Sequence, residues 1–118
     1  MAKVLVVDDA AFMRMRLSKL LKEHGHEVVE ASNGQEAVDR YRDAGPQVVL
    51  MDITMPVMDG IQAVLAIRGV DAQARIVMCS ALGQQSMVIE AIRAGAKDFV
   101  VKPYTPDRVL QAVNKWGG

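Results

Sequence analysis

Short apolar runs alternate with amphipathic segments along the whole chain. In the segments between the runs, apolar residues recur at intervals of three and four, which is the period of a helix that buries one face. Glycine follows several of these segments, as at Gly25, Gly45 and Gly95, and glycine is a common helix end. The runs themselves are rich in Val and Ile and predict strands at residues 3–8, 27–31, 47–52, 75–80 and 97–101.

Strict alternation of strands and helices, with strands that are apolar throughout, predicts a parallel sheet covered by helices on both faces. Right-handed crossovers then leave few topologies for a chain of five strand–helix units. No linker, repeat or low-complexity segment interrupts the pattern. We therefore expect one α/β domain over residues 1–118, a length that can bury about two-thirds of its unfolded surface.

The charge balance narrows the range of possible functions. The chain has 14 Lys and Arg residues against 14 Asp and Glu residues, so no basic excess indicates a nucleic-acid partner. A single cysteine, Cys79, cannot form an internal disulfide, and its apolar surroundings predict a buried thiol. The longest uncharged stretch, residues 76–89, is shorter than the roughly 20 residues that span a bilayer. We expect a cytoplasmic protein.

Functional side chains stand at the ends of four predicted strands. Asp8 ends the first strand and Asp9 follows it, Asp52 ends the third, Ser80 ends the fourth and Lys102 follows the fifth. In an open parallel sheet, ligands bind beyond the carboxyl ends of the strands, so these five side chains should converge at one edge. Each of these residues, taken alone, also has a purely structural interpretation. Asp9, for example, could simply be a cap at the start of the following helix.

Three carboxylates in one place need a cation. Two like charges 4 Å apart repel by about 4 kcal/mol at an effective dielectric near 20. Mg²⁺, which prefers oxygen ligands and also binds phosphate oxygens, would relieve the repulsion at Asp8, Asp9 and Asp52. With Lys102 and Ser80 nearby, such a site could stabilise a phosphoryl group transferred to a carboxylate. We therefore expect covalent phosphoryl chemistry with Mg²⁺ as cofactor.

The motifs LVVDD, VVLMDITMPVMDG, IVMCSA and GAKDFVVKP occur in this order. With these motifs, essentially the whole chain resembles the receiver domain of bacterial two-component response regulators, and within that family the stand-alone chemotaxis regulators. The resemblance implies a flavodoxin-like (βα)5 fold with strand order 2-1-3-4-5. It also implies a cis peptide bond between Lys102 and Pro103.

The resemblance implies a role for each candidate residue. Asp52 would accept the phosphoryl group, and the Thr54 carbonyl would join the three carboxylates around Mg²⁺. Lys102 and Ser80 would bind the phosphoryl oxygens, and Ser80 and Phe99 would act as the switch. Two positions depart from the commoner family pattern, because Phe99 stands where Tyr is frequent and Ser80 where Thr is frequent.

Output by protein docking follows from the resemblance to lone receivers. The expected partners are a histidine kinase of the CheA type and a flagellar motor switch protein, and an aspartyl-phosphate phosphatase could be a third. We expect a monomer. A phosphorelay intermediate of the sporulation type, or a receiver excised from a longer regulator, is the alternative.

The expected docking face depends on how the helix near residue 90 is oriented. We expect Ile89, Ile92 and Ala96 to face the sheet. Residues 87, 88, 91 and 94 would then face outward, and the docking face would comprise Met87, Val88, Ala91, Phe99 and Val101.

Two other classes are less consistent with the residues. Phosphatases of the haloacid dehalogenase type need a second Asp two positions after the nucleophile, where this chain has Ala10 or Thr54. A flavodoxin-like cofactor carrier needs a first loop that cradles a phosphate, and the segment DDAAF would repel one. We therefore do not expect an enzyme that turns over an external substrate.

Overall fold

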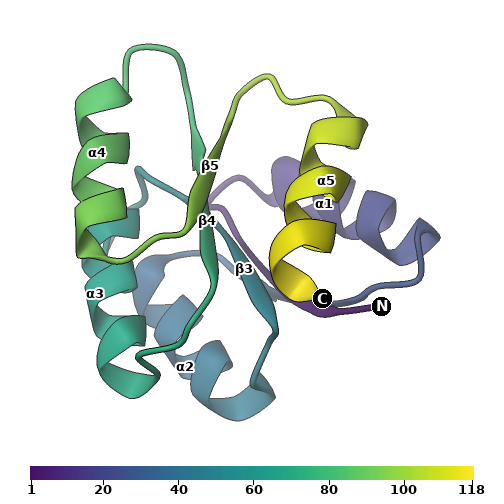
Figure 1. The fold of residues 1–118 in the computed structure, drawn as a ribbon, viewed down its shortest axis with the longest axis horizontal. Coiled ribbons are helices and arrows are strands. Elements are labelled where there is room, and N and C mark those ends of the chain that lie inside the picture. Colours follow the sequence, from purple (N-terminus) through teal and green to yellow (C-terminus); the bar gives the residue numbers. More distant parts are fainter.

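The computed structural model describes residues 1–118, in which five parallel strands alternate with five helices (Figure 1). The sheet has the order β2-β1-β3-β4-β5, so the predicted fold and topology are confirmed. The elements, in chain order, are β1 (Lys3–Val7), α1 (Ala11–Glu23), β2 (Glu27–Ala31), α2 (Gly34–Ala44), β3 (Val48–Asp52), α3 (Gly60–Val70), β4 (Ile76–Ser80), α4 (Gln85–Ala94), β5 (Asp98–Val101) and α5 (Pro106–Gly117).

Helices cover both faces of the sheet. Figure 1 shows α2, α3 and α4 on one side and α1 and α5 on the other. Each side has its own apolar core, one of 19 buried residues and one of 13. Neighbouring residues of one strand enter different cores, as Val4 and Leu5 of β1 do. This double burial explains why the central strands are apolar at consecutive positions instead of alternating.

Side-chain caps mark where three of the helices, α2, α3 and α5, begin. The Asn33 side chain accepts a hydrogen bond from the Glu36 N–H at the start of α2, and Thr105 does the same for α5 with Arg108. Asp59 and Gln62 form a reciprocal capping box at the start of α3. Asp59-Gly60 is therefore the turn and helix start that its sequence indicates.

Gly60 brings the beginning of α3 against the end of β3. A Cβ atom at this position would collide with the backbone oxygen of Asp52 and with the backbone of Ile53. The Gly60 N–H also donates a hydrogen bond to the Ile53 carbonyl at 2.7 Å. Only glycine allows this close approach, which holds the loop after Asp52 in place.

The predicted orientation of α4 is wrong. Val88 and Ala91 are buried in the core beneath α4, whereas Ile89 and Ile92 are 53% and 41% exposed. Both stripes are apolar, so the helical period alone could not distinguish them. Ala91, which has no accessible surface, and Val88 are smaller than isoleucine and suit the tightly packed side of the helix. The buried position of Ala96 is as predicted.

None of the helices combines the length and the apolar character that a membrane span requires. Cys79 is free and buried in β4, and burial raises the pKa of its thiol to about 12. The thiol is therefore protonated at neutral pH.

Candidate functional site

Three carboxylates meet at the carboxyl edge of the sheet, as predicted. In the parallel register Val7 of β1 lies opposite Met51 of β3, so the next residues, Asp8 and Asp52, are also neighbours. Each of Asp8, Asp9 and Asp52 offers an oxygen, and these oxygens lie within 4.8 Å of one another. Asp8 is buried, Asp52 is partly buried and Asp9 is exposed, so the cluster opens to solvent on one side.

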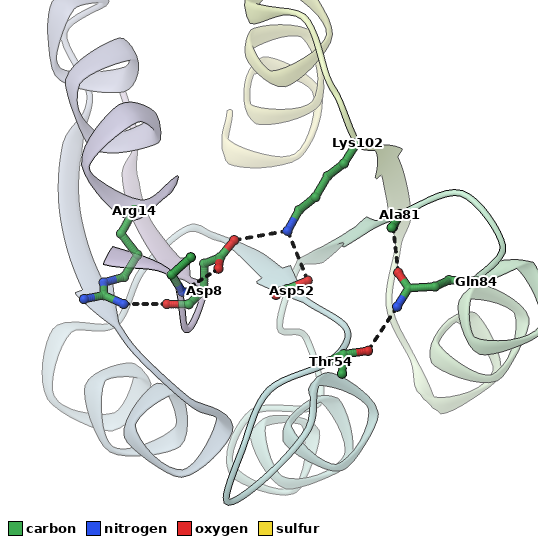
Figure 2. A network of polar contacts seen from close by, with 8 residues as sticks. Asp8, Arg14, Asp52, Thr54, Ala81, Gln84 and Lys102 are labelled. Carbon is green, nitrogen blue, oxygen red and sulfur yellow. Dashed lines mark hydrogen bonds and ion pairs between the residues drawn. The ribbon is translucent and has the colours of Figure 1, made fainter. Parts of the chain in front are cut away.

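Lys102 joins two of these carboxylates. Its Nζ lies 3.2 Å from Asp8 Oδ2 and 3.3 Å from Asp52 Oδ1 (Figure 2). The backbone N–H of Lys102 donates to the Ser80 carbonyl at 2.6 Å, and the Lys102–Pro103 bond is cis, as expected. Three carboxylates and one ammonium leave two negative charges, which one divalent cation would balance.

The surroundings change the acidity of both partners. Burial raises the pKa of Asp52 above its usual value, and the charge of Asp8 acts in the same direction while Lys102 opposes it. Burial by itself would lower the pKa of Lys102, but the charges of Asp52 and Asp8 outweigh it and raise the pKa. Lys102 is therefore a stable ammonium group, and ionised Asp52 is held less favourably than an exposed aspartate.

Backbone groups and one arginine orient Asp8. Its Oδ1 accepts a hydrogen bond from the Ala10 N–H at 2.9 Å, and its carbonyl accepts one from the Arg14 guanidinium at 2.6 Å (Figure 2). Arg14 also lies 3.4 Å from Glu30 of β2. Sequence reasoning missed Arg14. Its position one helical turn after Ala10, on a helix that begins at the site, was the available signal.

On the other side of Asp52, a glutamine joins two loops. Gln84 Nε2 donates to Thr54 Oγ1 at 3.0 Å, and Gln84 Oε1 accepts from the Ala81 N–H at 2.6 Å (Figure 2). Thr54 itself is exposed. Sequence reasoning also missed Gln84, because a glutamine in a loop carries no pattern that distinguishes it from a solvated surface residue.

The switch candidates border an apolar cavity. Ser80 is buried at the end of β4, and Phe99 of β5 is 42% exposed. A cavity of about 240 Å³ lies between α4 and β5, and Ser80, Val88, Ile89, Phe99 and Val101 are among the residues that line it. The cavity therefore lies between Ser80, at the carboxyl end of β4, and the exposed residues of α4 and β5.

The predicted docking face is only partly at the surface. Met87, Phe99 and Val101 are each at least 40% exposed, whereas Val88 and Ala91 are buried and cannot contact a partner. The inverted orientation of α4 explains this correction, and it places Ile89 and Ile92 outside instead.

The carboxylates fit a magnesium ion. Mg²⁺ binds oxygen at about 2.1 Å in an octahedron, so two ligand oxygens are about 3.0 Å apart at adjacent corners and about 4.2 Å apart at opposite corners. The oxygens of Asp8, Asp9 and Asp52, all within 4.8 Å of one another, would each need to move inward by about 1 Å to share one ion. The exposed side of the cluster leaves room for the water molecules that Mg²⁺ usually keeps. The cluster can therefore hold a divalent metal.

Known proteins are similar to this chain in sequence and in fold. Residues 4–114 match the response regulator receiver domain. The chain is 62% identical to the chemotaxis protein CheY of Bacillus subtilis over 114 residues, covering 96% of this chain and 95% of that protein. Among solved structures, a CheX–CheY–BeF3–Mg²⁺ complex from Borrelia burgdorferi matches with a TM-score of 0.89 and 39% identity, covering 96% of this chain and 87% of that one.

A longer protein shares the fold as well. NtrX from Brucella abortus matches with a TM-score of 0.92 and 31% identity over 98% of this chain, which spans only 26% of the NtrX chain. The family match covers nearly all of the sequence, and the fold and the acidic edge of the sheet agree with it. The chain therefore belongs to the response regulator receiver domain family.

Proposed function

We propose that Asp52 accepts a phosphoryl group from a histidine kinase with Mg²⁺ as cofactor, and that the phosphorylated protein controls the flagellar motor switch in chemotaxis. The observation that carries the phosphoryl part is the group of three carboxylates with Lys102 bridging Asp8 and Asp52. The similarity to CheY over nearly the full length of both chains supports the chemotactic part. A sporulation-type phosphorelay intermediate has no better support.

The residues at the sheet edge suit this transfer. An Asp52 carboxylate oxygen attacks phosphorus and the bond from phosphorus to the donor imidazole breaks. The electron pair of that bond stays on the imidazole nitrogen, and the imidazole takes up a proton from solvent. The Lys102 ammonium, now between Asp8 and Asp52, would contact the phosphoryl oxygens, and the Ser80 hydroxyl would provide a further hydrogen bond. Mg²⁺ held by Asp8, Asp9, Asp52 and the Thr54 carbonyl would neutralise charge on the phosphoryl group.

The docking face in this proposal is revised to the residues that are exposed. Met87, Ile89 and Ile92 on α4, with Phe99 and Val101 on β5, are each at least 40% exposed. A group of apolar residues at the surface is typical of a partner site. When Ser80 moves toward the phosphoryl group, Phe99 can move into the adjoining cavity, which would favour the binding form of a pre-existing equilibrium.

Labelling by a small phosphodonor tests the phosphoryl chemistry. With Mg²⁺ and acetyl phosphate, the protein should gain one phosphoryl group by intact mass, and hydroxylamine should remove it because the product is an acyl phosphate. Asp52→Asn should block the labelling. Labelling that survives this substitution, or that resists hydroxylamine, would contradict the assignment of Asp52.

Binding to a purified flagellar switch protein tests the output. Ile89→Asp should abolish phosphorylation-dependent binding without changing the labelling of Asp52, because Ile89 is exposed on α4 and is not among the residues that bind the phosphoryl group. Glu90→Ala, which alters an exposed neighbour without burying a charge, is the control. Normal binding by Ile89→Asp would show that output uses another surface.

A further inference from the structure

A single glutamine side chain connects the two loops that border Asp52. Gln84 immediately precedes α4, and its amide donates to Thr54 Oγ1 at 3.0 Å and accepts from the Ala81 N–H at 2.6 Å (Figure 2). Thr54 lies two residues after Asp52. The amide therefore ties the loop after β3 to the loop after β4, using both of its hydrogen-bonding atoms.

The Ala81 N–H lies where a phosphoryl group on Asp52 would need donors. The register of the sheet pairs Asp52 with Cys79, so Ser80 and Ala81 run beside the residues that follow Asp52. A phosphoryl group adds three oxygens at this edge, and Lys102 approaches Asp52 from the β5 side. The first backbone N–H beyond Ser80 is thus an available donor on the β4 side, but Gln84 already occupies it.

We propose, resting on the function proposed above, that Gln84 is a positioning residue that stabilises the unphosphorylated state. Its amide oxygen occupies the Ala81 N–H until a phosphoryl oxygen on Asp52 takes that donor, and the bridge to Thr54 then opens. A hydrogen bond to an anionic oxygen is about twice as strong as one to a neutral amide oxygen, so the exchange is favourable once Asp52 carries the phosphoryl group.

Opening of the bridge would reach the docking face. Gln84 immediately precedes α4, so a change in the position of its side chain acts directly on the residue from which the helix carrying Met87 and Ile89 begins. The bridge can favour the resting state only if it is absent from the phosphorylated state, because a contact that is equally strong in both states does not change the equilibrium between them. Losing the bridge as a unit should shift the equilibrium about fivefold, the net contribution of roughly one neutral hydrogen bond, because water partly replaces the partners of the freed groups.

Beryllofluoride binding in saturating Mg²⁺, measured by titration calorimetry, tests this shift. Gln84→Leu removes both hydrogen bonds and keeps similar volume, and it should lower the Kd for beryllofluoride about fivefold. Gln111→Leu is the matched control, because Gln111 is an exposed residue of α5 and makes none of the side-chain hydrogen bonds of the bridge. Its Kd should equal that of the wild type. An unchanged or raised Kd for Gln84→Leu would overturn the proposal.

The resting bridge has a signature of its own, without metal or phosphoryl mimic. In metal-free protein, NMR-detected hydrogen exchange of the Ala81 amide should accelerate in Gln84→Leu and stay unchanged in Gln111→Leu. Equal exchange rates in wild type and Gln84→Leu would show that the bridge does not hold this amide. A purely structural role would lower the melting temperature without changing the Kd for beryllofluoride, and that result would also overturn the proposal.

Thr54→Val provides a second route that leaves Gln84 in place. It removes the hydroxyl acceptor while keeping the shape, and it should lower the same Kd; the double variant with Gln84→Leu should show no further decrease. This variant carries the test if Gln84→Leu does not fold. Wild-type protein that fails to bind beryllofluoride would overturn the proposed function and this inference together. Normal wild-type binding with no change in either variant would overturn the inference alone.

Discussion

Lys102 and Mg²⁺ should compete for the same negative charge, and Lys102→Met measures this competition. Methionine keeps a long unbranched side chain and removes only the ammonium. At 3.2 and 3.3 Å from two carboxylates, the ammonium gains about 5 kcal/mol from each at an effective dielectric of 20. Desolvation cancels much of this gain. Removing one partner of a fully buried pair costs about 3–5 kcal/mol.

The Lys102 side chain keeps 24% of its exposure, so solvent screening reduces that cost. We expect Lys102→Met to lower the free energy of unfolding by about 2 kcal/mol in EDTA, which is about 8 °C for a domain of this size. In saturating Mg²⁺ the loss should shrink to about 0.6 kcal/mol, because the metal neutralises the same carboxylates. By linkage, the difference of about 1.4 kcal/mol means that Mg²⁺ binds about tenfold more tightly to the variant.

Urea unfolding followed by circular dichroism, in EDTA and in millimolar Mg²⁺, gives both quantities. Lys19→Met is the control, because Lys19 is an exposed residue of α1 and should change stability by less than about 0.5 kcal/mol in either buffer. If Lys102→Met loses the same stability with and without Mg²⁺, then Lys102 and the metal do not share these carboxylates and the magnesium site is wrongly placed.

Three further predictions follow from other residues. Val57 is 84% exposed and has a φ of 69°, a backbone conformation that strains a β-branched residue, so Val57→Gly should raise the free energy of unfolding by about 0.5–1 kcal/mol. The control Val70→Gly, at the end of α3, should lower it, and a Val57→Gly variant less stable than the wild type would contradict the strain at Val57. In urea unfolding, Val88→Ala should lower the free energy of unfolding by about 1.5 kcal/mol and Ile89→Ala by less than about 0.5 kcal/mol. A larger loss for Ile89→Ala than for Val88→Ala would instead support the orientation of α4 predicted from the sequence. Burial, and after it the charges of the amino terminus and His24, lowers the pKa of His26 below 6.5. Below about pH 6.5 the unfolded chain therefore binds more protons than the folded one, and the free energy of unfolding should fall with decreasing pH by at most about 1.4 kcal/mol per pH unit. His26→Asn should flatten this slope between about pH 7 and pH 5, and an unchanged slope would exclude His26 as its source.

The sequence predicts the fold and the acidic site well because both follow from rules of parallel sheets. Runs that are apolar at every position require cover on both faces, and strand ends in a parallel sheet meet at one edge. This is sufficient to bring Asp8, Asp52 and Lys102 together although they are far apart in the chain. Ser80 reaches the same edge by the same rule.

Two features were beyond sequence reasoning. In α4 the stripes containing Val88 and Ile89 are both apolar, so only the packing against the sheet and α3 decides which is buried. The Gln84 bridge depends on the path of the loop after β4, where Gly83 has a φ of 89°. Neither hydrophobic period nor a motif encodes that path.

The outer surface of α4 also has a consequence for how the protein behaves as a free molecule. The exposed Ile89 and Ile92 stand beside the exposed charged residues Glu90 and Arg93 on the same helix. Interspersed charges of both signs keep an apolar surface from promoting aggregation. The docking proposed above requires both properties, because the protein must stay dispersed at high concentration and still bind its target. On α4, neighbouring charged and apolar residues therefore combine solubility with a binding surface within little more than one helical turn.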